Sequence, residues 1–162
     1  MNAYPIALRL LHIAVFALLP AKRVVEKRVS FVVDVVLTAT ALEHRTPDDA
    51  ALAFVWIWHE SAGDPNATSP DGLDHGLTQL RGPALQGHLP SEVKADPVLA
   101  VRLWFRWLDV ARELCKGPDA AALGALSTGK CRGAKARVAR RCAFAGVDCS
   151  VARWSGATAI EL

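Results

Sequence analysis

Proline-containing signals mark where helices must begin along this sequence. Thr46–Asp49 combines a capping hydroxyl, a proline for the first helical position and carboxylates for the positive helix end. This pattern predicts a helix over 50–61 that ends near Gly63. Asp96-Pro97 predicts a long helix to about Cys115, and Pro118-Asp119 predicts another that closes at Gly129.

The remaining segments are assigned by their periodicity. Apolar residues between Lys22 and Arg45 recur at spacings of three and four, which predicts a helix despite the β-branched run 31–36. The segment 63–87 is rich in glycine and proline and is expected to be a loop with a short helical turn at 77–80. The basic segment 130–141 is expected to contain one more helix. The sequence therefore predicts an all-α or nearly all-α fold.

Length and composition limit the class of protein. The chain has 162 residues, with 52% hydrophobic and 22% charged residues, which fits one packed domain and excludes disorder, collagen and a charged coiled coil. The stretch 10–21 lacks charged residues but is too short to span a bilayer. Residues 1–21 resemble a signal peptide, and the alternative is a retained helix that packs on the domain.

Glu60 has the environment of a general acid. It lies near the C-terminal end of the predicted apolar helix 50–61, one turn after Trp56 and close to Trp58. Apolar neighbours and the negative end of a helix dipole both favour the protonated carboxyl. A protonated carboxyl can donate a proton to the leaving oxygen of a glycosidic bond.

The residues after Glu60 resemble the signature of soluble lytic transglycosylases. The matching positions are Glu60-Ser61, Pro65, Ala67, Ser69, Gly72, Gly76-Leu77 and Gln79-Leu80. The resemblance covers 51–80 in detail and extends more weakly to 123–131. It implies a lysozyme-like domain over 46–145 with a substrate cleft, preceded by a helical extension over 1–45 and followed by a tail over 146–162.

The resemblance also assigns roles to residues. Glu60 is the single catalytic acid and base in the cleavage of peptidoglycan between N-acetylmuramic acid and N-acetylglucosamine, which forms 1,6-anhydro ends without a cofactor. Ser69 and Gln79 match positions that support substrate binding and the catalytic loop. Gly76 is expected to let the sugar approach closely.

Two departures from the family keep other functions open. Leu126 stands where members of the family commonly have a tyrosine, so its hydroxyl is either missing or supplied by another residue such as Ser127 or Thr128. An extra residue between Gly72 and Gly76 brings in Asp74, which could serve as the second carboxylate of a hydrolytic muramidase or could cap its own loop. A structural or wall-binding component of a phage tail or secretion apparatus, without turnover, is the third hypothesis.

The cysteines and histidines argue for disulfides and against a metal. Cys115, Cys131, Cys142 and Cys149 contain no Cys-x-x-Cys pair, and His59-Glu60 lacks the second histidine of a His-Glu-x-x-His metalloprotease. An even number of cysteines in a wall-active protein suggests disulfides, and Cys115–Cys131 with Cys142–Cys149 would each close a short loop. In a reducing cytosol all four would stay thiols.

Charge is distributed unevenly and suggests partners. Residues 46–100 carry a net charge of −6 and residues 101–162 carry +6. The cations of the basic segment 130–141 form a solvated face or bind anionic wall polymers or lipid headgroups. Nucleic acid ranks below these partners because the segment has no aromatic residue to stack on bases. The expected location is the cell envelope, in the periplasm or outside the cell, reached by export or by delivery in a phage particle or secretion machine.

Overall fold

The computed structural model describes residues 9–10, 23–132 and 135–150. The chain forms two compact units, residues 1–105 and 106–162, and the division between them falls within one long helix. Within the described residues the secondary structure is helical apart from two isolated β-bridges, which confirms the expected all-α class. None of the described helices is both long enough and apolar enough to cross a membrane.

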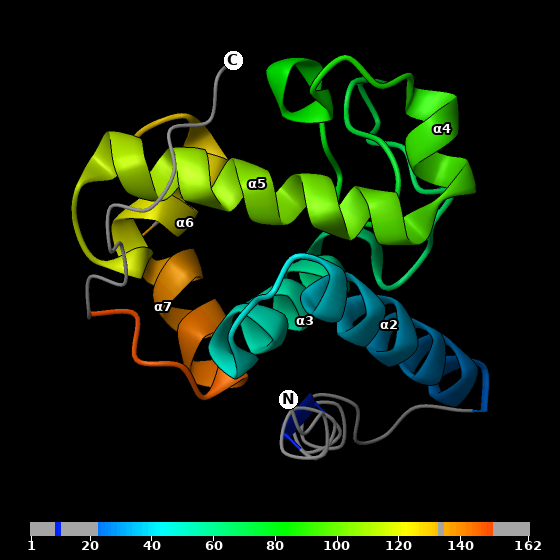
Figure 1. Cartoon of the computed structure of the whole chain (residues 1–162), viewed down its shortest axis with the longest axis horizontal. Coiled ribbons are helices and arrows are strands. Elements are labelled where there is room, and N and C mark those ends of the chain that lie inside the picture. The colour runs from blue at the N-terminus through cyan, green and yellow to red at the C-terminus, as the bar shows by residue number, and fades with distance from the viewer. Residues whose placement is uncertain (1–8, 11–22, 133–134, 151–162) are drawn as a thin grey trace. The chain divides into compact units, whose positions relative to one another are not determined.

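The first unit is built around α3. Its helices are α2 (Arg23–Leu42), α3 (Pro47–Ser61), the short 3₁₀ helix η1 (Gly82–Leu85), α4 (Pro90–Ala95) and the first half of α5 (Pro97–Cys115). Figure 1 shows α2, in blue, lying against α3, in cyan. The helices predicted over 22–45, 50–61 and 97–115 are thus confirmed to within a few residues.

α3 is the centre of this unit because it is buried on every side. All residues from Asp49 to Ile57 are buried, as expected for a helix without a polar face. Its start is fixed by the predicted cap. The Thr46 hydroxyl accepts a hydrogen bond from the Asp49 amide at 3.2 Å, and the Asp49 carboxylate accepts one from the Thr46 amide at 3.3 Å. The Trp56 and Trp104 rings, 5.7 Å apart, join α3 to α5.

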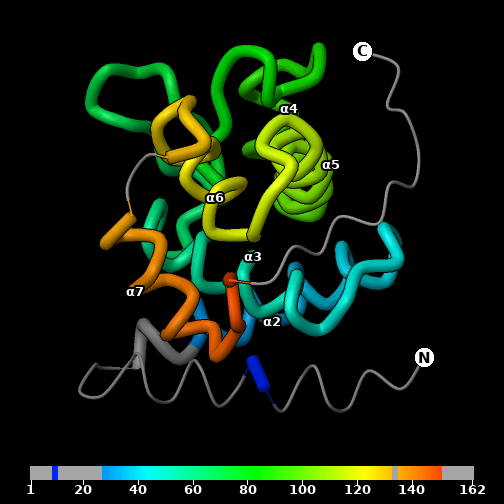
Figure 2. Tube along the Cα trace, turned by 90° about the vertical axis from the view of Figure 1, so that its left-hand side faces the viewer, coloured from blue at the N-terminus to red at the C-terminus, as the bar shows by residue number. Residues whose placement is uncertain are grey.

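The second unit contains the end of α5 with α6 (Asp119–Thr128) and α7 (Lys135–Ala145). α6 and α7 pack against each other, as the tube in Figure 2 shows. Two disulfides join Cys115 to Cys131 and Cys142 to Cys149, which confirms the expected pairing. The buried Arg112 guanidinium donates to the buried Asp119 carboxylate at 2.8 and 3.0 Å.

The segment 63–87 and the residues after it differ in detail from the expectation. The turn at 77–80 is a hydrogen-bonded turn enclosed by a β-bridge, not a helical turn, and η1 and α4 were not predicted. α4 has only six residues and an apolar Leu89 at its N-cap position, so it lacks the usual start signal. The Glu92 carboxylate caps it instead by accepting from the Leu89 amide at 2.7 Å. Residues 1–8 and 11–21 lie outside the described residues, so the signal-peptide hypothesis stays untested.

Candidate active site around Glu60

Glu60 lies half-buried in the last turn of α3, where the sequence placed it. The helix ends at Ser61, and its C-cap Ala62 adopts a left-handed conformation with φ of 50° and donates its amide to the Trp58 carbonyl at 3.2 Å. Gly63 follows with φ of 75°, and a Cβ at that position would lie 3.0 Å from a Val32 methyl of α2. Glycine is therefore required there both by the backbone and by the close approach of α2.

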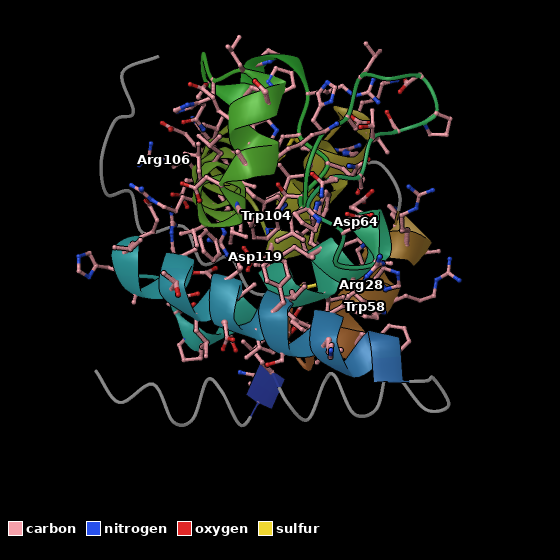
Figure 3. All side chains as sticks on the ribbon, turned by 90° about the vertical axis from the view of Figure 1, so that its right-hand side faces the viewer. Arg28, Trp58, Asp64, Trp104, Arg106 and Asp119 are labelled. Atoms are coloured by element: carbon pink, nitrogen blue, oxygen red, sulfur yellow. A yellow bond between two sulfur atoms is a disulfide. The ribbon has the colours of Figure 1, made fainter. Side chains whose placement is uncertain are left out.

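α2 covers the end of the helix that carries Glu60. Figure 3 shows Arg28, Trp58 and Asp64 gathered at this end of the unit. The Arg28 guanidinium lies 4.0 Å from the Asp64 carboxylate and donates to the Ala62 carbonyl at 3.5 Å. Because Arg28 binds the groups that directly follow α3, it supports the position of the helix end and of the loop that leaves it.

The loop 64–80 is attached to the end of α3 by two side chains of that helix. The Ser61 hydroxyl donates to the Leu77 carbonyl at 2.7 Å, and the Trp56 indole donates to the Thr78 carbonyl at 3.1 Å. Trp56 and Glu60 are one helical turn apart and share a face. The two hydrogen bonds therefore attach the segment 77–78 to the last two turns of α3, the helix that carries Glu60.

Two isolated β-bridges join three short segments and give this loop its internal order. The bridges Thr68–His75 and His75–Leu80 place residues 74–76 between 67–69 and 80–81. The Gly76 amide donates to the Ala67 carbonyl at 2.9 Å, and the His75 and Leu80 amides exchange hydrogen bonds at 3.0 and 3.1 Å. A loop rich in glycine and proline is thus held in one register by backbone hydrogen bonds.

The predicted binding residues Ser69, Gly76 and Gln79 all belong to this ordered loop. The Ser69 hydroxyl donates to Asp71 and accepts from the Asp74 amide at 2.9 Å. The side-chain amide of Gln79 donates to the Gly76 carbonyl at 2.8 Å, and Gln79 has a positive φ of 52°. In the structure the side chains of Ser69 and Gln79 therefore stabilise the loop by hydrogen bonds within it.

Gly76 has a structural reason to be glycine. Its φ is 72°, and a Cβ there would lie 3.2 Å from a Val93 methyl of α4 and 3.7 Å from the Pro65 carbonyl oxygen. The sequence interpretation attributed the missing side chain to the approach of a sugar. The space that a side chain would take is filled by α4, so helix packing already requires glycine.

Asp74 is held by Arg81. Its carboxylate accepts two hydrogen bonds from the Arg81 guanidinium, one of them at 2.6 Å, and this bond and charge raise the pKa of Arg81. Residues 74 and 81 are a cross-strand pair, because the bridge between His75 and Leu80 sets them opposite each other. Hydrogen bonds from the Ser69 hydroxyl and the Leu73 amide lower the pKa of Asp71 at the tip of the same loop.

Two supporting residues, Thr78 and Arg81, were not singled out from the sequence, and Ser61 was only part of the matched pattern. Ser61, Thr78 and Arg81 hold the loop, and the Thr78 hydroxyl also donates to the Ala100 carbonyl of α5 at 3.2 Å. The turn signature Pro70-Asp71-Gly72 was the available signal, because it predicts a reversal that pairs residues on either side. The Gly72 amide does close this turn on the Ser69 carbonyl at 2.9 Å.

The weaker second match lies in the other unit. Leu126, Ser127 and Thr128 form the last turn of α6, and the Thr128 hydroxyl donates to the Gly124 carbonyl at 2.9 Å.

No three histidine, cysteine, aspartate or glutamate side chains gather as metal ligands within the part of the chain that the structure describes.

No protein-family model, curated protein or solved structure matches the chain.

Proposed function

We propose that the protein is a peptidoglycan lytic transglycosylase with Glu60 as its catalytic acid and base. The observation that carries this proposal is the pair of hydrogen bonds from Trp56 and Ser61 to the loop segment 77–78. These bonds attach the loop that follows the carboxyl to the end of the helix that carries it. A loop attached in this way would hold the substrate in a fixed position relative to the carboxyl, which general acid catalysis requires.

The proposed reaction uses one carboxyl group twice. Glu60 donates its proton to the oxygen that links C1 of N-acetylmuramic acid to N-acetylglucosamine, and the C1–O bond breaks. The resulting carboxylate then accepts the proton of the 6-hydroxyl of the muramic acid as that oxygen bonds to C1. The products are an anhydro-ended strand and a strand with a new hydroxyl, and no water is consumed.

The pairing of Asp74 with Arg81 favours this reaction over hydrolysis by a muramidase. A second catalytic carboxylate must attack the sugar or activate water. The Asp74 carboxylate instead accepts two hydrogen bonds from a guanidinium, which reduces its availability for either task. Asp74 fits better as part of the loop scaffold, and the muramidase is the second hypothesis.

The test is the digestion of purified sacculi followed by mass spectrometry of the soluble fragments. We expect the wild-type chain to release anhydro-ended fragments, and we expect Glu60→Gln to lower the rate at least about a hundredfold, since general acid catalysis contributes at least that factor. Glu113→Gln, at an exposed position on α5, is the matched control and should keep full activity. Circular dichroism checks that each variant is folded.

Each alternative gives a different result. Fragments heavier by one water, together with loss of activity in Asp74→Asn, would establish the muramidase. Unchanged clearing by folded Glu60→Gln would exclude both enzymatic hypotheses. Binding to sacculi without any release of fragments would identify a structural or wall-binding component.

The proposed place of action is the cell envelope. The two disulfides fit an oxidising compartment, such as the periplasm or the exterior of the cell. Peptidoglycan strands, the proposed substrate, are found there. Delivery to this compartment by export, in a phage particle or by a secretion machine is part of the same proposal.

A further inference from the structure

The second unit contains a pocket that the proposed catalysis does not use. Its volume is about 580 Å³, within the range of roughly 300–1,000 Å³ for sites that bind small molecules. The start of α6, one face of α7 and the segment 147–150 form its walls. Among the residues that the structure describes, those that line the pocket all belong to the second unit.

The interior of the pocket is apolar. Ala121 of α6, Val138 and Ala139 of α7, and Val147 line it, together with atoms of both disulfides. The lining positions on α7 recur at spacings of three and four, so a single face of the helix turns toward the pocket. Such a lining offers an occupant apolar contacts and favours a hydrocarbon chain.

The pocket also has cations at its edge. Arg132 and Lys135 line it, and both are exposed. Lys135 is the first residue of α7, where the positive end of the helix dipole adds to the attraction for an anion. The one lining carboxylate, that of Asp148, accepts hydrogen bonds from the Ser150 amide at 2.9 Å and the Ser150 hydroxyl at 2.6 Å.

We propose that this pocket binds an anionic membrane phospholipid, with an acyl chain against Val138 and Ala139 and the phosphate at Arg132 and Lys135. The occupant must combine a hydrocarbon chain with a negative headgroup, because the lining combines an apolar wall with a cationic edge. An anionic wall polymer would pair with the cations but would not fill the apolar part of the pocket. The proposal does not depend on the catalytic role of Glu60, which lies in the other unit.

The geometry of α7 provides matched variants. Arg137 and Arg140 are exposed on the same helix but do not line the pocket, so they separate a general effect of charge from the pocket itself. Ala139 is an exposed lining residue, and Ala136 is an exposed residue of α7 outside the lining. Ala139→Phe therefore fills the pocket without changing any charge, and Ala136→Phe adds the same ring elsewhere.

The experiment measures sedimentation of the full chain with vesicles of phosphatidylglycerol or phosphatidylcholine. We expect binding to phosphatidylglycerol and at least about tenfold weaker binding to phosphatidylcholine. Each cation near an anionic surface contributes about fivefold, so R132Q/K135Q should weaken binding about 25-fold and R137Q/R140Q much less. Ala139→Phe should weaken it about tenfold or more, and Ala136→Phe should leave it within about twofold.

Several outcomes would overturn the proposal. Equal losses in the two double-cation variants, with no effect of Ala139→Phe, would mean general attraction to negative surfaces. Binding to a soluble polyglycerol phosphate that matches binding to vesicles would identify a wall polymer. If the wild-type chain does not bind vesicles but does so after removal of residues 151–162, the C-terminal segment is the occupant. Because Arg132 and Lys135 are exposed, their variants remain informative even if Ala139→Phe unfolds.

Discussion

Ser61 is the residue that connects the proposed catalytic carboxyl to its loop. Its hydroxyl donates to the carbonyl of Leu77, and Leu77 is fully buried. A buried carbonyl without a hydrogen bond costs more free energy than the bond itself contributes. The serine that follows Glu60 therefore has a structural function that its place in the sequence pattern alone did not explain.

Ser61→Ala should lower the free energy of unfolding by about 1–3 kcal/mol, because the buried Leu77 carbonyl loses its partner. It should also reduce the release of fragments from sacculi, since the loop is less firmly held beside Glu60. Urea denaturation measures the stability. Ser91→Ala, on an exposed position of α4, is the control and should change stability by less than about 0.5 kcal/mol. A Ser61→Ala variant as stable as the wild type would contradict this explanation of the loop.

The direction of the Asp74 side chain could not be predicted from the sequence. Its carboxylate belongs to a cross-strand pair with Arg81, and this pairing depends on the register set by two isolated bridges. A shift of one residue would turn each side chain to the other side. Candidate residues of the site could thus be listed from the sequence, but their hydrogen-bond partners could not.

Helix starts were predictable wherever a polar cap precedes a proline. α3 begins after Thr46 and α5 after Asp96, whose carboxylate accepts from the Leu99 amide at 2.9 Å. These caps are local interactions, so a few residues of sequence contain the full signal. α4 has no such cap side chain, and its six residues are too few for a clear hydrophobic period.

Thr46→Ala should lower the free energy of unfolding by about 1 kcal/mol, because the first turn of the central helix loses its capping hydroxyl. Thermal and urea denaturation test this value. Thr38→Ala removes the same hydroxyl from an exposed position within α2, where the loss should be smaller. Equal losses in the two variants would show that the cap has no special role.

At the scale of the whole molecule, the two units are stabilised by different means. All four cysteines lie after residue 105, and both disulfides are within the second unit. The first unit depends on the buried helix α3 and the hydrogen-bonded loop. This division could not be predicted from the sequence, because the boundary lies inside α5, where the helical pattern is continuous.

Reduction of the two disulfides should therefore destabilise the second unit and leave the first unchanged. The disulfide between Cys115 and Cys131 spans 16 residues, and a loop of that size corresponds to about 3 kcal/mol of stabilisation. With dithiothreitol, amide hydrogen exchange should accelerate over α6 and α7, while the amides of His75, Gly76 and Leu80 keep their protection. Reoxidation should restore the slow exchange. Equal acceleration in both units would contradict the assignment of the disulfides to one of them.

The turn at residues 70–73 has a practical consequence. All four residues are exposed, and the backbone pairing resumes only at Asp74. A fluorescent label or a short peptide epitope inserted at this tip would project into water and leave the hydrogen-bonded segments 67–69 and 74–76 in place.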